Sequence, residues 1–190
     1  MTQLGWCLWV TGLSGSGKSV ISKKVFEKLR ETGVSAQIIG SDVLRRWVTP
    51  NPKYSEDERT MIYSIIVFVA KLLNQNGINV IIDATANRRL YREKARRQIL
   101  RFMEAYIQCP LEICINRETE RKNTFNAPRS IYQKAFVGES VTVPGISVAY
   151  EEPLNPEVIV DSDKLNPDQC ALKIVRTLRE VFNQKDEVKK

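Results

Sequence analysis

Residues 12–19, GLSGSGKS, have the composition and spacing of a loop that binds a chain of phosphates. They fit the pattern G-x-x-x-x-G-K-[ST] at every fixed position, between an apolar segment and one with helical periodicity. In such a loop successive backbone N–H groups point inward, and the dipole of the following helix adds attraction for anions. Lys18 would reach the β- and γ-phosphates of ATP, and the Ser19 hydroxyl would coordinate Mg²⁺. The residues expected to bind ATP here are Gly12, Leu13, Ser14, Gly15, Ser16, Gly17, Lys18 and Ser19.

Two aspartates stand at the ends of apolar segments further along the chain. Asp42 follows residues 35–40, with Arg45 three residues later. In kinases of the nucleotide type the end of the second strand faces the acceptor, so Asp42 could take the acceptor's proton and Arg45 could hold its phosphate or sulfate. Asp83 ends the apolar stretch NVIID, and a carboxylate there would hold Mg²⁺ beside Ser19. The alternative for each aspartate is a cap on the helix that follows it.

An arginine-rich segment follows Asp83, and a solvated helix face is the default interpretation of such a run. Its members are Arg88, Arg89, Arg92, Arg96 and Arg97. Arg88 and Arg89 are the exceptions, because they fall in the first turn of the expected helix, where the helix dipole opposes a cation. An anion bound nearby would explain their presence, and we take Arg89 as a candidate residue for binding the acceptor.

Apolar segments alternate with helical ones along the chain, which predicts an α/β fold with a parallel sheet covered on both faces by helices. The expected strands are 7–12, 35–40, 79–83, 105–109 and 158–163, and the expected helices include 18–33, 56–76, 111–122 and 168–182. We expect one domain over residues 1–183 and a charged tail at 184–190.

Residues 117–150 are polar, become irregular towards their end, and suit a mobile lid more than a core element. The cations of this segment are Arg117, Arg121, Lys122, Arg129 and Lys134. We expect Arg117 or Arg121 to close over bound ATP.

Composition narrows the classes of partner and of catalyst. The formal charge of +7 favours anionic partners, although it also suits general solubility. The chain contains no histidine, so proton transfer falls to a carboxylate, a lysine or the substrate, and a Cys/His zinc site is excluded. Four cysteines without CxxC spacing, in a chain without a signal-peptide pattern, predict a reducing cytoplasm. The apolar stretch at 61–73 is too short to span a membrane, so no membrane partner is expected.

Motifs spread over nearly the whole chain resemble the adenylylsulfate (APS) kinase family. They are GLSGSGKS, EDER (56–59), VAKLLNQNG (69–77), RRLYREKAR (88–96), CPLEICINR (109–117), IYQKA (131–135) and EEPLNPEVIVDSD (151–163). The resemblance implies a five-stranded P-loop kinase that transfers the γ-phosphate of MgATP to the 3′-hydroxyl of adenylylsulfate. Members of the family often act as homodimers, so a homodimer is a possible state of this chain. The resemblance also implies that Arg59 binds the acceptor and that Lys134 lies in the lid.

The acceptor motifs depart from the family pattern. The family's Asp-Gly-Asp-Asn-x-Arg falls on residues 40–45, where Asp42 and Arg45 are kept and the first aspartate is Gly40. The family's Phe-Ile-Ser-Pro-[FY]-Arg falls on residues 84–89, where only Arg89 is kept. The aromatic rings that sandwich the acceptor's adenine fall on Ala84 and Val143, and Asp83 is a gain. At about 1–3 kcal/mol per stacked base, losing both rings would weaken adenylylsulfate binding roughly a hundredfold or more.

Four functions remain open at this point. The leading hypothesis is an ATP-dependent kinase with adenylylsulfate as its acceptor, and the second is a kinase of another small anionic or nucleotide-linked alcohol. A nucleic-acid 5′-hydroxyl kinase is suggested by the charge and by DATANRR, but nucleic acid is an unlikely partner because no pattern of interleaved aromatic and basic residues is present. A nucleotide-binding module without catalysis is the fourth.

Overall fold

Five parallel strands form the centre of the molecule. The computed structural model describes residues 3–49 and 51–187 of the chain. Its sheet has the order β2-β3-β1-β4-β5. The strands are β1 (Cys7–Thr11), β2 (Ala36–Gly40), β3 (Asn79–Asp83), β4 (Phe102–Gln108) and β5 (Val158–Asp161). The predicted five-stranded parallel sheet is confirmed, and all neighbouring strands pair in parallel.

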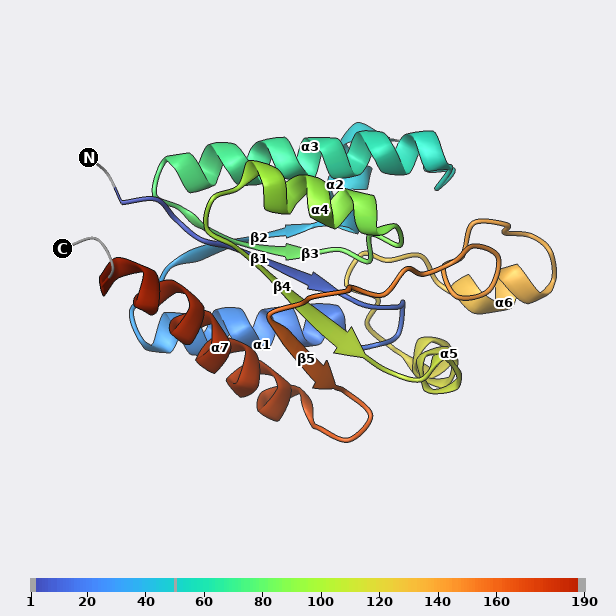
Figure 1. The fold of residues 1–190 in the computed structure, drawn as a ribbon. Coiled ribbons are helices and arrows are strands. Elements are labelled where there is room, and N and C mark those ends of the chain that lie inside the picture. Colours follow the sequence, from blue (N-terminus) through green and yellow to red (C-terminus); the bar gives the residue numbers. More distant parts are fainter. Residues whose placement is uncertain (1–2, 50, 188–190) are drawn as a thin grey trace.

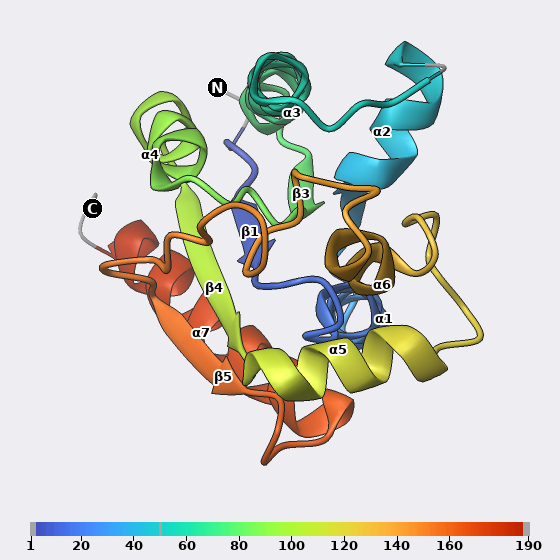
Figure 2. The same ribbon diagram turned by 90° about the vertical axis from the view of Figure 1, so that its right-hand side faces the viewer.

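Helices cover both faces of this sheet, as the alternating pattern predicts. Figure 1 shows α1 and α7 on one face and α3 and α4 on the other. Figure 2 shows α5 and α6 beyond the carboxyl ends of the strands, where α2 also begins. The helices are α1 (Lys18–Glu31), α2 (Ser41–Val48), α3 (Glu56–Gln75), α4 (Arg89–Gln98), α5 (Leu111–Glu120), α6 (Ile131–Phe136) and α7 (Pro167–Glu187).

The core consists of one apolar layer on each face of the sheet. Successive side chains of a strand point to opposite faces, so Leu8 and Val10 of β1 pack with the buried residues of α1 and α7. Trp9, between them in sequence, packs in the other layer with Ile62 and Tyr91 from α3 and α4. Burial on both faces explains why β1 is a continuous apolar run.

The largest departures from the predicted elements concern β4, α6 and α7. β4 begins at Phe102, three residues before the expected start, and this brings the buried Glu104 into the sheet. α6 lies within the expected lid, where the sequence analysis named no helix. α7 continues to Glu187, so part of the predicted tail at 184–190 is helical, and 188–190 lie outside the described residues.

The helices and the cysteines bear on whether the chain spans a membrane or forms disulfide bonds. Among the residues that the structure describes, no helix combines the length and the apolar character that crossing a membrane would require. Cys7, Cys109, Cys114 and Cys170 are buried and free.

Candidate active site

The loop between β1 and α1 has the backbone shape of a phosphate cradle. Gly12, Gly15 and Gly17 have φ values of 152°, 81° and 94°, which side chains rarely allow. A Cβ on Gly15 would lie 2.1 Å from the carbonyl oxygen of Cys114 in α5, so the loop also depends on close approach of two backbones. Glycine is therefore required in this loop by positive φ values and, at Gly15, also by the close approach of the α5 backbone.

Lys18 and Asp83 are two charged residues of opposite sign that line a cavity at this loop. Lys18 is buried, and its Nζ donates to the Leu13 carbonyl at 2.8 Å. Burial lowers the pKa of Lys18, and the nearby carboxylate of Asp83 opposes that shift. Burial raises the pKa of Asp83, while Lys18 and a hydrogen bond with the Ser19 side chain act in the opposite direction. Lys18, Ser19 and Asp83 are thus brought together, as expected.

A cavity of about 510 Å³ opens above the loop, and we call it the P-loop cavity. The predicted site residues that line it are Ser14, Gly15, Gly17, Lys18, Ser19, Asp42, Asp83, Arg117 and Arg121. Arg117 donates to the carbonyl of Ser162 at 2.8 Å, and Arg121 donates to that of Pro128 at 2.6 Å. Gly12 and Leu13 are not among the residues that line it, and Ser16 lines a smaller neighbouring cavity together with Arg117 and residues 162–167.

A second cavity, of about 310 Å³, adjoins the first, and we call it the cationic cavity. Asp42 and Thr85 line both cavities and so lie between them. Among the described residues, the charged side chains that line the cationic cavity are Arg45, Lys53, Arg59, Arg129 and Lys134, against Asp42 and Glu139. This excess of cations suits an anionic ligand.

The two central arginines of the cationic cavity are held by neighbouring groups. Arg45 pairs with Glu58, and its guanidinium lies 4.5 Å from the centre of the Tyr54 ring. Arg59 donates to Asn87 Oδ1 at 2.8 Å, to the Tyr54 carbonyl at 2.9 Å and to the Thr142 carbonyl. Both guanidinium groups are therefore fixed before any ligand arrives.

Positions 84 and 143, where the family pattern has aromatic rings, carry none here, but other aromatic residues line the cationic cavity. Tyr54 and Tyr63 line it together with Val143, whereas Ala84 lines the P-loop cavity. Tyr54 lies five residues before Arg59, and its φ of 56° is unusual for a residue with a side chain. This aromatic residue stands in the stretch KYSEDER (53–59), close to Arg59 in the sequence, and not at either position where the family pattern has its rings.

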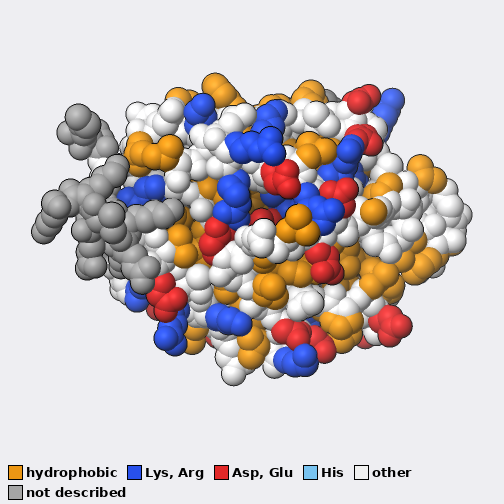
Figure 3. All heavy atoms as spheres, viewed as in Figure 1, with side chains coloured by type: hydrophobic (Ala, Val, Ile, Leu, Met, Phe, Trp, Pro, Cys, Tyr) orange, Lys and Arg blue, Asp and Glu red, His pale blue; other side chains and the backbone are white. Residues whose placement is uncertain are grey.

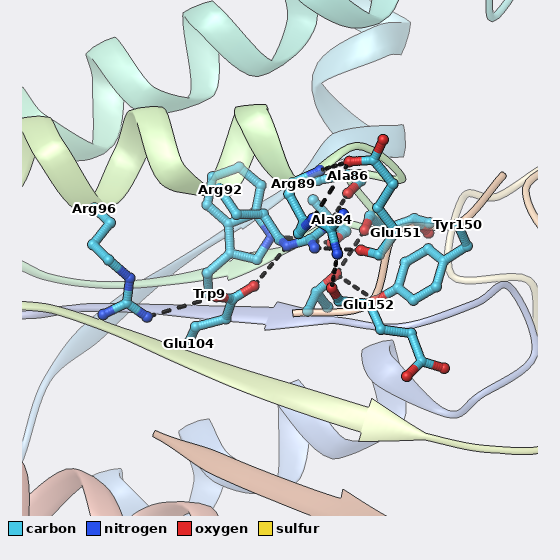
Figure 4. Close-up of polar contacts among 12 residues, drawn as sticks. Trp9, Ala84, Ala86, Arg89, Arg92, Arg96, Glu104, Tyr150, Glu151 and Glu152 are labelled. Carbon is cyan, nitrogen blue, oxygen red and sulfur yellow. Dashed lines mark hydrogen bonds and ion pairs between the residues drawn. The ribbon is translucent and has the colours of Figure 1, made fainter. Parts of the chain in front are cut away.

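The first turn of α4 does not place Arg89 in either cavity, which corrects its predicted location. Arg89 donates its backbone N–H to Glu151 at 2.8 Å and a guanidinium N–H to the Glu152 carbonyl at 3.3 Å (Figure 4). Arg88 pairs with Glu56. The anions that compensate these cations are therefore carboxylates of the protein itself.

Arg92 also departs from the prediction of a solvated helix face. It is 2% exposed and pairs with Glu104 of β4, its Nε lying 2.6 Å from a carboxylate oxygen. A buried glutamate on the neighbouring strand requires a cation on this face of α4.

Neither aspartate serves as a helix cap. The cap positions of α2 and α4 are Gly40 and Arg88, and neither makes a side-chain capping hydrogen bond. Asp42 and Asp83 instead line the P-loop cavity, so the capping alternative is removed for both.

Comparisons with known proteins agree with this site. The sequence pattern described as "Adenylylsulphate kinase" matches residues 4–161. A probable adenylyl-sulfate kinase of Pyrococcus abyssi is 38% identical over 177 residues, which are 93% of this chain and 97% of the relative. The adenylyl-sulfate kinase of Rippkaea orientalis is 34% identical and covers 95% of each chain. The solved structure of the Mycobacterium tuberculosis APS kinase CysC in complex with AMPPNP and APS has a TM-score of 0.82 and 30% identity, over 93% of this chain and 98% of that chain.

The chain belongs to the adenylylsulfate kinase family. The predicted family resemblance is therefore confirmed, and the protein is a P-loop kinase.

In this adenylylsulfate kinase family member, burial raises the pKa of Asp42 above its usual range, although Arg45 and Lys18 oppose the shift. A carboxylate with a raised pKa is better matched to proton transfer near neutral pH than a free one.

The raised pKa of Asp42 has a consequence for stability. Between the ordinary aspartate pKa of about 3.9 and the raised value, the folded ligand-free protein binds more protons than the unfolded chain, so its stability falls as pH rises. Asp42→Asn should therefore be more stable than wild type at neutral pH, with a difference that shrinks as the solution is acidified. Urea unfolding across this range measures the effect, with the exposed Asp163→Asn as control. A variant less stable than wild type at neutral pH would contradict the interpretation.

Proposed function

We propose that this kinase transfers the γ-phosphate of MgATP to the 3′-hydroxyl of adenylylsulfate. The observation that carries the proposal is the position of Asp42, shared by the P-loop cavity and the cationic cavity. The relatives' names and the bound AMPPNP and APS of the Mycobacterium tuberculosis protein support the assignment. Another small anionic or nucleotide-linked alcohol is the alternative acceptor. A cavity of about 310 Å³ suits such a molecule better than a nucleic acid.

Catalysis would rest on positioning and charge neutralisation, as phosphoryl transfer requires. The backbone of the P-loop and Lys18 would hold the donor phosphates. Asp42 would accept the proton of the attacking hydroxyl or orient that hydroxyl. Arg45 and Arg59 would bind the acceptor's anionic groups, with Lys134 at the rim, and the Tyr54 ring offers a surface for the acceptor's base.

Ser19 and Asp83 would hold Mg²⁺. Their hydroxyl and carboxylate oxygens are the hard ligands that this ion prefers, and both residues line the P-loop cavity. No group of three or more metal-binding side chains occurs among the described residues. That agrees with a Mg²⁺ ion that keeps waters and uses substrate phosphates as ligands. The ion would neutralise charge on the transferring phosphate.

The segment 117–150 would act as a lid over both ligands. It supplies Arg117 and Arg121 to the P-loop cavity and Lys134 to the cationic cavity. The neighbouring cavity between Arg117 and residues 162–167 would take the adenine of ATP. The free cysteines suit a reducing compartment, which supports a cytoplasmic reaction in sulfate assimilation.

The proposed reaction is tested by coupled measurement of ADP release. Wild-type protein with MgATP and adenylylsulfate should release ADP well above the background with ATP alone. Lys18→Ala and Asp42→Ala should each lower kcat/KM by about a hundredfold or more, because each removes a charge at the reacting groups. Release that never exceeds the ATP-only background with adenylylsulfate would reject the named acceptor, and release with another nucleotide-linked alcohol would support the alternative.

The gain of Asp83 beside the loss of an aspartate at position 40 suggests that one carboxylate has moved across the sheet. Gly40 and Asp83 are register partners on β2 and β3. Paired positions on adjacent parallel strands lie about 4.8 Å apart and point to the same face. A Cβ on Gly40 would meet only Val43, at 3.4 Å, and its φ of −92° suits any residue.

A carboxylate at position 40 should therefore replace the one at position 83. Asp83→Ala should reduce the Mg²⁺-dependent gain in ADP affinity by about 10–100-fold, the usual effect of losing a residue that supports a metal site. Adding Gly40→Asp to this variant should restore most of the gain. Calorimetric titration with ADP, with and without Mg²⁺, gives the measurement. Gly40→Asn in the same background is the matched control and should restore nothing; equal rescue by both would refute the role of charge.

We also propose that the protein is a homodimer that pairs through α3. This helix exposes Met61, Phe68 and Leu72, at 44%, 65% and 51%, with the half-buried Ile65 between them. Figure 3 shows hydrophobic side chains along the edge of the molecule where α3 runs. The spacing of four, three and four residues is that of a seam between paired helices, and an exposed apolar stripe indicates an interaction site.

Sedimentation velocity should show a dimer for the wild type and a monomer for Phe68→Asp, because the variant would bury a charge in the seam. Leu100→Asp is the matched control, since Leu100 is 80% exposed and lies outside the stripe. A monomeric wild type, or dissociation of both variants alike, would exclude pairing through α3.

A further inference from the structure

Arg92 contacts the loop after β3, which supplies Thr85 to the lining of the cationic cavity, and the segment before β5. Its guanidinium donates to the carbonyl of Ala86 and, at 2.5 Å, to the carbonyl of Glu151, while its Nε faces Glu104 (Figure 4). It does not line either cavity. One buried cation therefore joins the loop after β3, the segment before β5 and the strand β4.

The loop that Arg92 contacts has an unusual backbone. Ala86 has a φ of 42°, in the left-handed region, which is unfavourable for a residue with a side chain. Its N–H donates to the Tyr63 hydroxyl at 3.0 Å, and its carbonyl accepts from Arg92. Both backbone groups of the strained residue are thus bound by buried side chains.

The next residue carries this arrangement into the cationic cavity. Asn87 accepts from Arg59 through Oδ1 at 2.8 Å and donates to the Ala149 carbonyl at 3.2 Å. Its own carbonyl accepts from the N–H of Glu151 at 2.7 Å. Arg92 and Asn87 therefore both join the loop after β3 to the segment before β5. Of the two, only Asn87 also contacts Arg59.

We propose that Arg92 is a positioning residue for the acceptor, acting through Asn87 on Arg59. By fixing the Ala86 and Glu151 carbonyls, it sets where Asn87 presents its amide oxygen and hence where the Arg59 guanidinium lies. The inference rests on the proposed function only in naming the molecule that Arg59 binds. The fork of a guanidinium is needed, because a lysine cannot meet Glu104 and two carbonyls in fixed directions at once.

Arg96 is the control position that distinguishes positioning of the acceptor from general stabilisation of the fold. It lies one turn along α4 and also pairs with Glu104, its Nη2 lying 3.6 Å from the carboxylate. Its other partner is Glu157, at 2.5 Å, and no hydrogen bond joins it to Ala86 or Glu151. A substitution at Arg96 therefore disturbs the same buried carboxylate, Glu104, but removes no hydrogen bond to the loop after β3 or to Glu151.

The test compares steady-state kinetics of Arg92→Lys with those of Arg96→Lys. Arg92→Lys should raise KM for adenylylsulfate roughly tenfold while KM for ATP stays within about twofold of wild type, because the P-loop is held by other groups. Arg96→Lys should leave both KM values near wild type. Equal changes in the two KM values of Arg92→Lys, or equal changes in both variants, would show that Arg92 only stabilises the fold.

The uncharged variant Asn87→Ala tests the same connection and does not break a buried ion pair. It should raise KM for adenylylsulfate and leave KM for ATP unchanged. Adding Arg92→Lys to it should raise KM for adenylylsulfate little further, because both substitutions disturb the same contact between Asn87 and Arg59. Fold-changes that multiply would overturn the proposed route through Asn87. A wild type that turns over no adenylylsulfate rejects the acceptor, and the comparison is then made with the nucleotide-linked alcohol that supports ADP release.

Discussion

The parallel register of β3 between β1 and β2 is the constraint on which the site depends. Val10 of β1 pairs with Asp83, and Asp83 pairs with Gly40 of β2. Because parallel strands end at one edge, the P-loop, the start of α2 and the loop after β3 all begin within a few residues of that line. Lys18, Asp42 and Asp83 meet there although they come from three separate segments of the chain.

Charge compensation then decides which cations remain available to a ligand. Arg45 and Arg92 are almost fully buried, and each has one glutamate partner in close contact, Glu58 or Glu104. A buried charge without such a partner would cost several kcal/mol. The remaining cations of the cationic cavity outnumber its acids, so the field that a ligand meets there is positive. Arg92 is thus neutralised outside the cavity, whereas Arg45, although paired with Glu58, still lines the cavity and adds to its excess of cations.

The sequence predicts the P-loop and the five strands well because their signals are local. Glycine at positive φ, an adjacent lysine and unbroken apolar runs are properties of a few consecutive residues. The arginines of α4 show the limit of such reasoning. Arg89 and Arg92 are three residues apart, yet the first is half-exposed and the second is buried. Their difference depends on Glu104 and Glu151, which lie on other elements and are invisible to a pattern within the helix.

The loop after β3 explains how a site can be rewritten in its side chains and still keep its shape. The Trp9 indole donates to the Ala84 carbonyl at 3.1 Å, and Thr11 donates to the Thr85 carbonyl at 2.6 Å. Together with the bonds to Ala86, these contacts fix the backbone of residues 84–86 from β1, α3 and α4. Side chains at these positions therefore do not determine the course of the loop. Alanines can stand where the family pattern has an aromatic residue and a serine, while Tyr54 and Tyr63 supply aromatic rings to the cationic cavity.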